Sequence, residues 1–142
     1  MRLPPALSGA RGAVLAAFVT SGMLAVVWIA RLPALRDSLG LSPSEVGIAL
    51  LATAVGSIGA ISVVGRLAVS LGSDVVLRWS LPLMALGVAI IGFSVNYTML
   101  LVAAAVTGVF LGATDVTMNA QGSLIERQSG QRVLAGMHAG WS

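Results

Sequence analysis

The chain has 142 residues, of which 57% are hydrophobic and only 9% charged. Water-soluble domains carry about 25% charged residues, so this composition excludes a soluble globular protein. The formal net charge of +3 comes from eight basic residues, all arginine and all scattered singly, which excludes a basic patch for nucleic acid. The absence of cysteine excludes disulfides and thiol catalysis, and a single histidine gives no support for a zinc site. We therefore predict no cofactor and no metal.

Charged residues divide the chain into apolar stretches. Residues 12–30, 46–65 and 79–114 carry no charge. A helix needs about 20 apolar residues to cross a bilayer, so the third stretch is too long for one span, and Asn96-Tyr97 supplies a turn signal within it. The sequence predicts four transmembrane helices and the start of a fifth, over residues 12–31, 43–65, 75–95, 98–123 and 133–142 onward.

The first predicted span has the alternative of being a signal peptide. Its apolar region exceeds the usual length of about 7–15 residues. It is followed by Arg31-Leu32-Pro33 instead of a small-residue cleavage site, and by further spans. These features favour a membrane helix.

The start of the second span has a specific signal. Ser42-Pro43-Ser44-Glu45 has the form of a capping box, with proline at the first helical position and Leu41 and Val46 at the hydrophobic-staple positions. We expect this helix to begin here, at the outer surface, where its first N–H groups need partners.

The basic residues predict the orientation. With the N-terminus in the cytoplasm, two arginines lie outside, Arg31 and Arg36, and six lie inside: Arg2, Arg11, Arg66, Arg78, Arg127 and Arg132. This distribution satisfies the positive-inside rule, whereas the opposite orientation inverts it. We predict a multi-pass protein of the cell (inner) membrane.

Small residues recur at every fourth position in two predicted helices. Ala52, Gly56 and Ala60 form one stripe, and Ala104, Gly108 and Gly112 form the other. Such stripes allow helix backbones to approach closely in lipid, although membrane helices are also generally rich in glycine. We favour close helix packing.

The second of these stripes continues into polar residues. Asp115, Asn119, Gly122 and Glu126 fall on the same line of the helix as Gly112. A carboxylate inside the hydrocarbon costs at least about 2.5–3.5 kcal/mol, so such residues face water or a partner and often bind substrate or protons. Asp115 is therefore our main candidate for a substrate or proton site. The alternative is a structural Asp bonded to a neighbouring helix.

Four further residues join Asp115 as candidates. Asn119 lies one turn further along and could share a ligand or hold the Asp115 carboxylate, or simply join two helices. His138 is expected about 8 Å into the membrane, near the depth of Asn119, where it would complete a polar cavity. Thr20 and Ser21 lie at mid-membrane in the first span and could touch substrate. For His138, Thr20 and Ser21 the alternative is a role without ligand contact.

Three segments together resemble the major facilitator superfamily. The predicted cytoplasmic loop of residues 65–74 is similar to the superfamily motif Gly-x-Leu-Ala-Asp-Arg-x-Gly-Arg-Lys, with Val69 at the acidic position and Ser70, Ser73 and Asp74 at basic ones. Residues 22–33 form the second segment. The third comprises residues 112–122, Glu126-Arg127 and residues 137–142, and it resembles a bacterial branch related to the fucose–proton symporters.

This resemblance implies a fold and a function. It implies an all-α membrane protein, in which residues 1–142 form an incomplete N-terminal half of a major facilitator domain, and a secondary transporter that contains the missing C-terminal part. The expected partners are a small solute, with sugar-like molecules among the candidates, protons and the lipid bilayer. Asp115 falls at the acidic position of the fourth helix of those symporters and Asn119 at their following Asn. Their first-helix acidic residue is absent here, where the chain has Thr20 and Ser21.

Two other functions compete with transport. A small four-helix protein that acts as an oligomeric channel subunit or assembly partner would also suit the glycine stripes. An intramembrane enzyme has little support, because the sequence contains no evident nucleophile–base pair or metal-ligand cluster. We therefore predict a transporter and not an enzyme.

Overall fold

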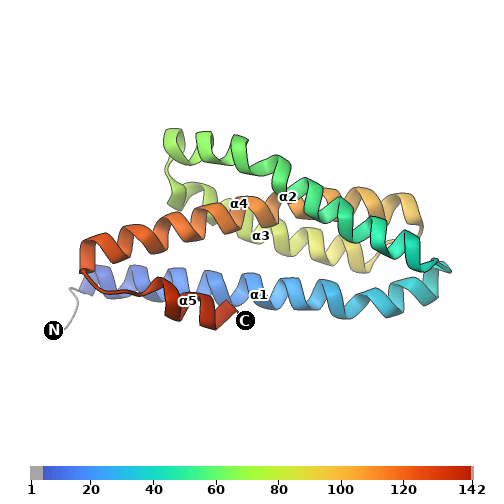
Figure 1. Ribbon diagram of the computed structural model, residues 1–142, viewed down its shortest axis with the longest axis horizontal. Helices are drawn as coiled ribbons and strands as arrows, with labels where there is room; N and C mark the ends of the chain where they lie inside the picture. Colours follow the sequence, from blue (N-terminus) through green and yellow to red (C-terminus); the bar gives the residue numbers. More distant parts are fainter. Residues whose placement is uncertain (1–4, 142) are drawn as a thin grey trace.

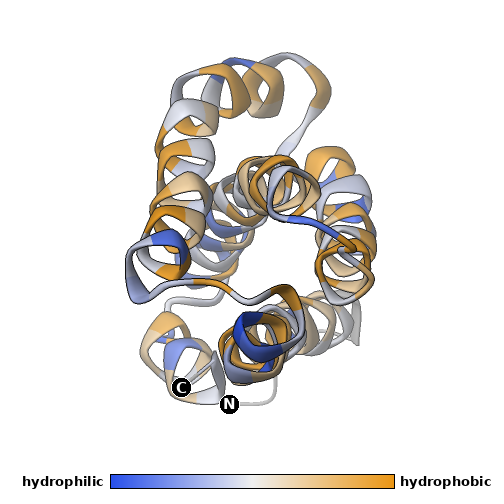
Figure 2. Cartoon of the chain, turned by 90° about the vertical axis from the view of Figure 1, so that its right-hand side faces the viewer, coloured by the Kyte–Doolittle hydropathy of each residue, from blue (hydrophilic) through white to orange (hydrophobic). Residues whose placement is uncertain are grey.

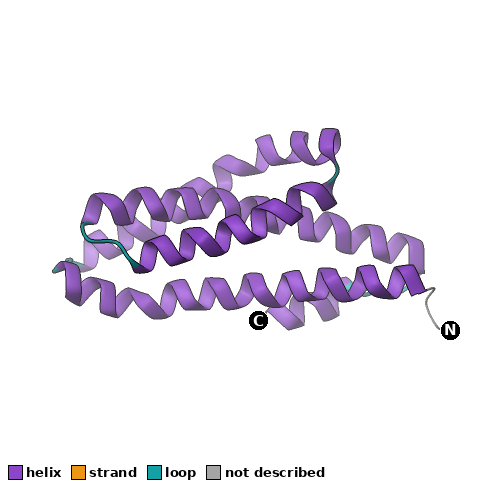
Figure 3. Ribbon diagram, turned by 180° about the vertical axis from the view of Figure 1, so that it is seen from behind, coloured by secondary structure: helices purple, strands orange, loops and turns teal. Residues whose placement is uncertain are grey.

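A computed structural model describes residues 5–141 and shows only helices joined by short turns in that part of the chain (Figure 3). The helices are α1 (Pro5–Leu39), α2 (Pro43–Leu71), α3 (Ser73–Gly92), α4 (Tyr97–Ser129) and α5 (Leu134–Trp141). The turns alternate between the two ends of the bundle, and α5 runs beside α1 (Figure 1). Four helices, α1 to α4, are long and apolar enough to cross a membrane, which confirms the predicted fold class. Arg2 and Ser142 lie outside the described residues.

The helices are longer than most of the predicted spans. Helix α1 covers residues 5–39 instead of 12–31 and contains Arg11, Arg31 and Arg36, while α4 runs six residues beyond the predicted end at 123. The difference arises because a charge marks the limit of the apolar crossing and not of the helix. A helix satisfies its own backbone hydrogen bonds and can therefore continue into the interfacial region, where arginine side chains reach water.

The predicted loop over residues 65–74 was wrong. Helix α2 continues to Leu71, and α3 begins at Ser73 instead of at residue 75. Gly72 alone separates them, with a φ of 95° that other residues rarely adopt, and its N–H donates to the Ala68 carbonyl oxygen at 3.2 Å. Because glycine adopts this conformation without strain, one residue is enough to reverse the chain, and a loop of several residues is not needed.

The predicted start of α2 was correct in detail. Ser42 is the N-cap, and its Oγ accepts from the Glu45 N–H at 3.3 Å while the Glu45 Oε2 accepts from the Ser42 N–H at 2.8 Å. Pro43 is the first helical residue, where a missing N–H costs nothing. Asn96 likewise caps α4, because its Oδ1 accepts from the Met99 N–H at 2.8 Å. Both turns at this end of the bundle therefore have satisfied donors.

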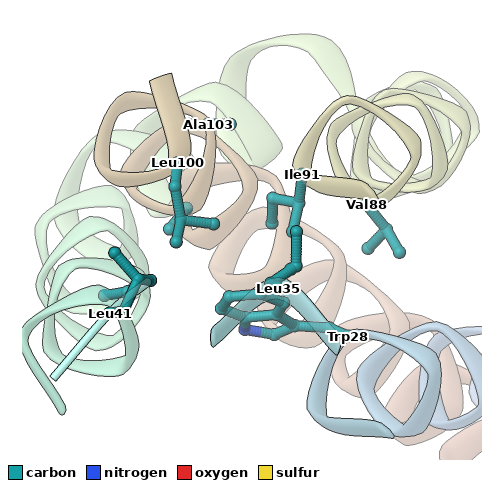
Figure 4. Packing of buried hydrophobic residues seen from close by; sticks show 9 residues of the cluster. Trp28, Leu35, Leu41, Val88, Ile91, Leu100 and Ala103 are labelled. Carbon is teal, nitrogen blue, oxygen red and sulfur yellow. The ribbon is translucent and has the colours of Figure 1, made fainter. Parts of the chain in front are cut away.

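A hydrophobic cluster joins the four long helices at the same end. Trp28 and Leu35 of α1 meet residues of the other three helices, including Leu41 before α2, Ile91 of α3 and Leu100 of α4 (Figure 4). The outward surface is also apolar, with large side chains such as Ile58 and Val102 at least 60% exposed. Hydrophobic residues accordingly run along all the helices in Figure 2. A protein that is apolar both inside and outside is suited to lipid.

Helices α2 and α4 cross with their backbones in contact. A Cβ on Gly56 would collide with the Ala105 carbonyl oxygen, and one on Gly108 would collide with that of Thr53. A Cβ on Gly112 would lie 2.5 Å from the Ser57 carbonyl oxygen. The predicted close packing is confirmed for these glycines. Because the contact lies within one chain, the glycine stripes no longer favour assembly between chains.

We predict that Gly108→Ala destabilises the protein while Gly59→Ala does not. The added methyl at position 108 meets the backbone of α2, which cannot move aside as a side chain would, so the cost should reach the upper part of the overpacking range, about 3 kcal/mol. Gly59 has nothing within 4 Å of a built Cβ, so alanine there should gain from its helix propensity. Thermal unfolding of the two purified variants would test this, and equal stability would contradict it.

Candidate functional site

Helix α4 holds Asp115 near its middle. Asp115 lies about 27 Å along the helix from Tyr97 and about 21 Å from Ser129, at ~1.5 Å per residue. The hydrocarbon core is only about 30 Å thick. The side chain is therefore far from both helix ends, at a position that lies within the hydrocarbon when a helix of this length crosses a bilayer.

Contacts with two neighbours fix the rotation of α4. On one side, the Thr114 hydroxyl donates to the Ser80 Oγ of α3 at 3.0 Å, in a fully buried contact. One turn or two further on, the Gln121 Nε2 donates to the Ser73 Oγ at 2.7 Å. On another side, Gly112 faces α2. Asp115 is left exposed on the remaining face of α4.

Asn119 binds Asp115 through its side-chain amide. The Asn119 Nδ2 donates to the Asp115 Oδ1 at 3.2 Å and also to the Asp115 backbone oxygen at 2.9 Å. The backbone oxygen acts only as a hydrogen-bond acceptor, and so does Oδ1 when the carboxylate is ionised. The two bonds therefore fix which side of the amide points toward Asp115, and they leave the Asn119 Oδ1 directed elsewhere.

His138 reaches this pair from α5. Its Nε2 lies 3.1 Å from the Asn119 Oδ1, so the predicted approach of His138 to Asn119 is present in the structure. The ring also packs edge-on against Phe18 of α1, with centroids 5.0 Å apart and planes at 77°. Three elements, α1, α4 and α5, thus position one imidazole (Figure 1 shows α4 and α5 joined at the left-hand end).

Two features of the turn before α5 set its position. Gly130 ends α4 in the left-handed region with a φ of 65°, and the Glu126 Oε1 accepts from the Leu134 N–H at 3.0 Å at the start of α5. The sequence analysis placed Glu126 on the polar line of the fourth span and did not predict this cap. Its signal was the pairing of an acidic residue with a helix start eight residues later, which helix spacing alone does not reveal.

Close contacts then hold α5 along α1 and α4. Gly122 of α4 faces the side chains of Leu134 and Met137, and a Cβ on Gly22 of α1 would collide with the Trp141 carbonyl oxygen. Val133 and Met137 are buried with Phe18 in the same cluster. Gly122 and Gly22 therefore allow α5 to approach closely enough for His138 to reach Asn119.

Thr20 and Ser21, the two candidates in the first span, lie on different faces of α1. Ser21 is fully buried, and its hydroxyl faces the Met84 sulfur of α3 at 4.0 Å. Thr20 is exposed, about 200° around α1 from Phe18, which faces His138. Among residues 5–141, Asp115, Asn119 and His138 form one connected group, to which neither Thr20 nor Ser21 hydrogen-bonds.

The connected group combines one carboxylate, one amide and one imidazole. Such groups can bind polar solutes by hydrogen bonds, and the carboxylate and imidazole can each take up a proton. No set of three His, Asp or Glu side chains suited to a metal occurs among residues 5–141.

A bundle of apolar helices of membrane-crossing length, with an ionisable side chain halfway along one of them, is typical of membrane transport proteins. Comparison with known families agrees: the model of the Major Facilitator Superfamily matches residues 13–142. The chain belongs to this superfamily of transporters, and it is a multi-pass membrane protein.

Two curated relatives are similar over most of the chain. An uncharacterized transporter from Sinorhizobium fredii is 30% identical over 91% of this chain and 34% of its own length. An uncharacterized MFS-type transporter from Yersinia pestis is 26% identical over 86% of this chain and 32% of its own length. The chain thus spans about a third of the length of these relatives. No solved structure matches it significantly.

Proposed function

We propose that this chain contributes the polar centre of a secondary transporter that moves a small polar solute together with protons. The observation that carries the proposal is the exposed Asp115 carboxylate, halfway along a helix long enough to cross the membrane and bonded to Asn119 at 3.2 Å. In this proposal Asp115 exchanges the proton, and Asn119 and His138 complete the surface that the solute meets.

The exposure of Asp115 supports a cavity at this face. An ionised carboxylate facing acyl chains at this depth would cost several kcal/mol, and one amide does not replace its hydration. The face of α4 with Asp115 must therefore meet water or more protein. Transporters of this architecture place their site between two halves near the midplane. We place these helices in the first half, with the Asp115 face toward the second.

The likeness to the fucose–proton symporters supports the same assignment. Asp115 and Asn119 occupy positions similar to their fourth-helix acidic residue and Asn. The solute is proposed to be sugar-like in its chemistry, because a carboxylate, an amide and an imidazole suit ligands with several hydroxyl groups. Thr20 is exposed at a similar depth in α1 and remains a candidate contact, whereas buried Ser21 has no part in the proposal.

We expect Asp115→Asn to abolish proton-driven uptake in the intact transporter while membrane insertion stays normal. The amide keeps the size of the side chain but, unlike a carboxylate, does not take up or release a proton at physiological pH. Asp74→Asn is the matched control, because Asp74 is an exposed carboxylate in the first turn of α3, and its uptake should be unchanged.

The measurement is uptake of a panel of radiolabelled sugars and amino acids into vesicles with an imposed pH gradient, with loss expected to be at least about tenfold. Exchange of labelled for unlabelled solute needs no net proton movement. This assay therefore separates a loss of proton coupling from a loss of solute binding. Asp115→Asn uptake equal to that of Asp74→Asn would overturn the proposed role.

We further propose that the N-terminus lies in the cytoplasm and that the protein resides in the cell (inner) membrane. The end of the bundle with the start of α1 also has the α2–α3 and α4–α5 turns (Figure 1). Arg11, Arg66, Arg78, Arg127 and Arg132 lie toward this end, and Arg31 and Arg36 lie toward the other. This excess of arginine supports a cytoplasmic location for the first end.

Ser38 and Ser70 provide a matched test of orientation. Each is exposed and lies one residue before the end of its helix, α1 and α2 respectively. In intact cells, a membrane-impermeant maleimide should label Ser38→Cys and not Ser70→Cys, and permeabilised cells should label both. Labelling of Ser70→Cys alone in intact cells would reverse the orientation.

A further inference from the structure

The Asn119 amide has its orientation determined by what lies on each side of it. Its Nδ2 faces two oxygens of Asp115, at 2.9 Å and 3.2 Å. Turning the amide over would place the Asn119 Oδ1 against both of these acceptors, which would replace two attractive contacts with two repulsive ones. The Oδ1 must therefore be the atom that faces His138.

The orientation of the Asn119 amide determines which ring nitrogen of His138 carries the proton. The Asn119 Oδ1 can only accept, and the His138 Nε2 lies 3.1 Å from it. A hydrogen bond at this distance requires the proton on Nε2, so the lone pair of the neutral ring is on Nδ1. Phe18 restricts the plane of the ring by its edge-on contact at 5.0 Å. The ring is thus fixed both in direction and in tautomer.

We propose that Asn119 is a positioning residue: its amide, oriented by two oxygens of Asp115 on α4, holds His138 on α5 in the Nε2–H tautomer. The proposal rests on the proposed transport function and deepens it: the imidazole that the solute meets is held in a single tautomer. It also makes the contact between α4 and α5 depend on an amide that Asp115 holds, in a part of the bundle where Gly122 brings the two helices together.

The nitrogen NMR spectrum of the ring tests this directly. The intact transporter is labelled with ¹⁵N-histidine and reconstituted in lipid, and the His138 signals are assigned by their loss in His138→Gln. At a pH where the ring is neutral, the wild-type spectrum should show protonated Nε2 and unprotonated Nδ1. A predominant Nδ1–H form would overturn the proposal.

Substitutions at position 119 separate positioning from packing. Asn119→Leu, which keeps the size but removes the acceptor, should raise the fraction of the Nδ1–H form severalfold, and Asn119→Ala should do the same if the leucine variant does not fold. Asn119→Asp keeps an acceptor for the ring and should retain Nε2–H. Gln121→Leu is the control, because Gln121 bonds to Ser73 on another face of α4, and it should leave the spectrum unchanged.

Two outcomes distinguish this proposal from the transport function. In Asp115→Asn the backbone oxygen of residue 115 still accepts from Asn119, so the Nε2–H form should persist even where uptake is lost. A spectrum of Asn119→Leu identical to that of the wild type would overturn the positioning role, whatever the transport assay shows. Normal uptake by Asp115→Asn with the expected spectra would instead overturn the proton-coupling role alone.

Discussion

A carboxylate halfway along a membrane-crossing helix needs a polar partner, and this requirement shapes the region around Asp115. Lipid offers no hydrogen bonds, so the side chain depends on the amide of Asn119 and on whatever meets the exposed face of α4. Asn119 in turn leads to His138, which comes from a helix that begins fifteen residues later in the chain. The hydrogen bonds that satisfy the Asp115 carboxylate thus link α4 to α5 through Asn119 and His138.

Glycine packing makes this arrangement possible. With no hydrophobic effect to draw helices together in lipid, α2 and α4 associate through backbone contact at Gly56, Gly108 and Gly112. The Thr114–Ser80 hydrogen bond holds α3 on another side of α4. These contacts use up two faces of α4 and leave Asp115 on a third. A rotation of α4 by one residue, about 100°, would bury the carboxylate or turn it toward α2.

The sequence was sufficient to predict the number and order of the helices, the capping box at Ser42 and the approach of His138 to Asn119. These features depend on local chemistry or on depth along a helix, both of which can be read from residue spacing. Contacts between helices were harder to predict. Ser21 is buried against Met84 while Thr20 is exposed, and Glu126 caps α5. Both outcomes depend on how neighbouring helices are rotated about their axes. Helix ends were also misplaced, since charges such as Arg66 lie within helices.

We infer that the Asp115 face of α4 meets water in a cavity between the two halves of the transporter. The most direct test of this inference is the reactivity of Asp115→Cys toward a charged thiol reagent in the reconstituted transporter. Val106→Cys, on an exposed apolar part of the same helix, serves as the lipid-facing control. Asp115→Cys should react at least about tenfold faster than Val106→Cys, because thiols ionise in water and not in hydrocarbon. Equal and slow reaction at both positions would contradict it.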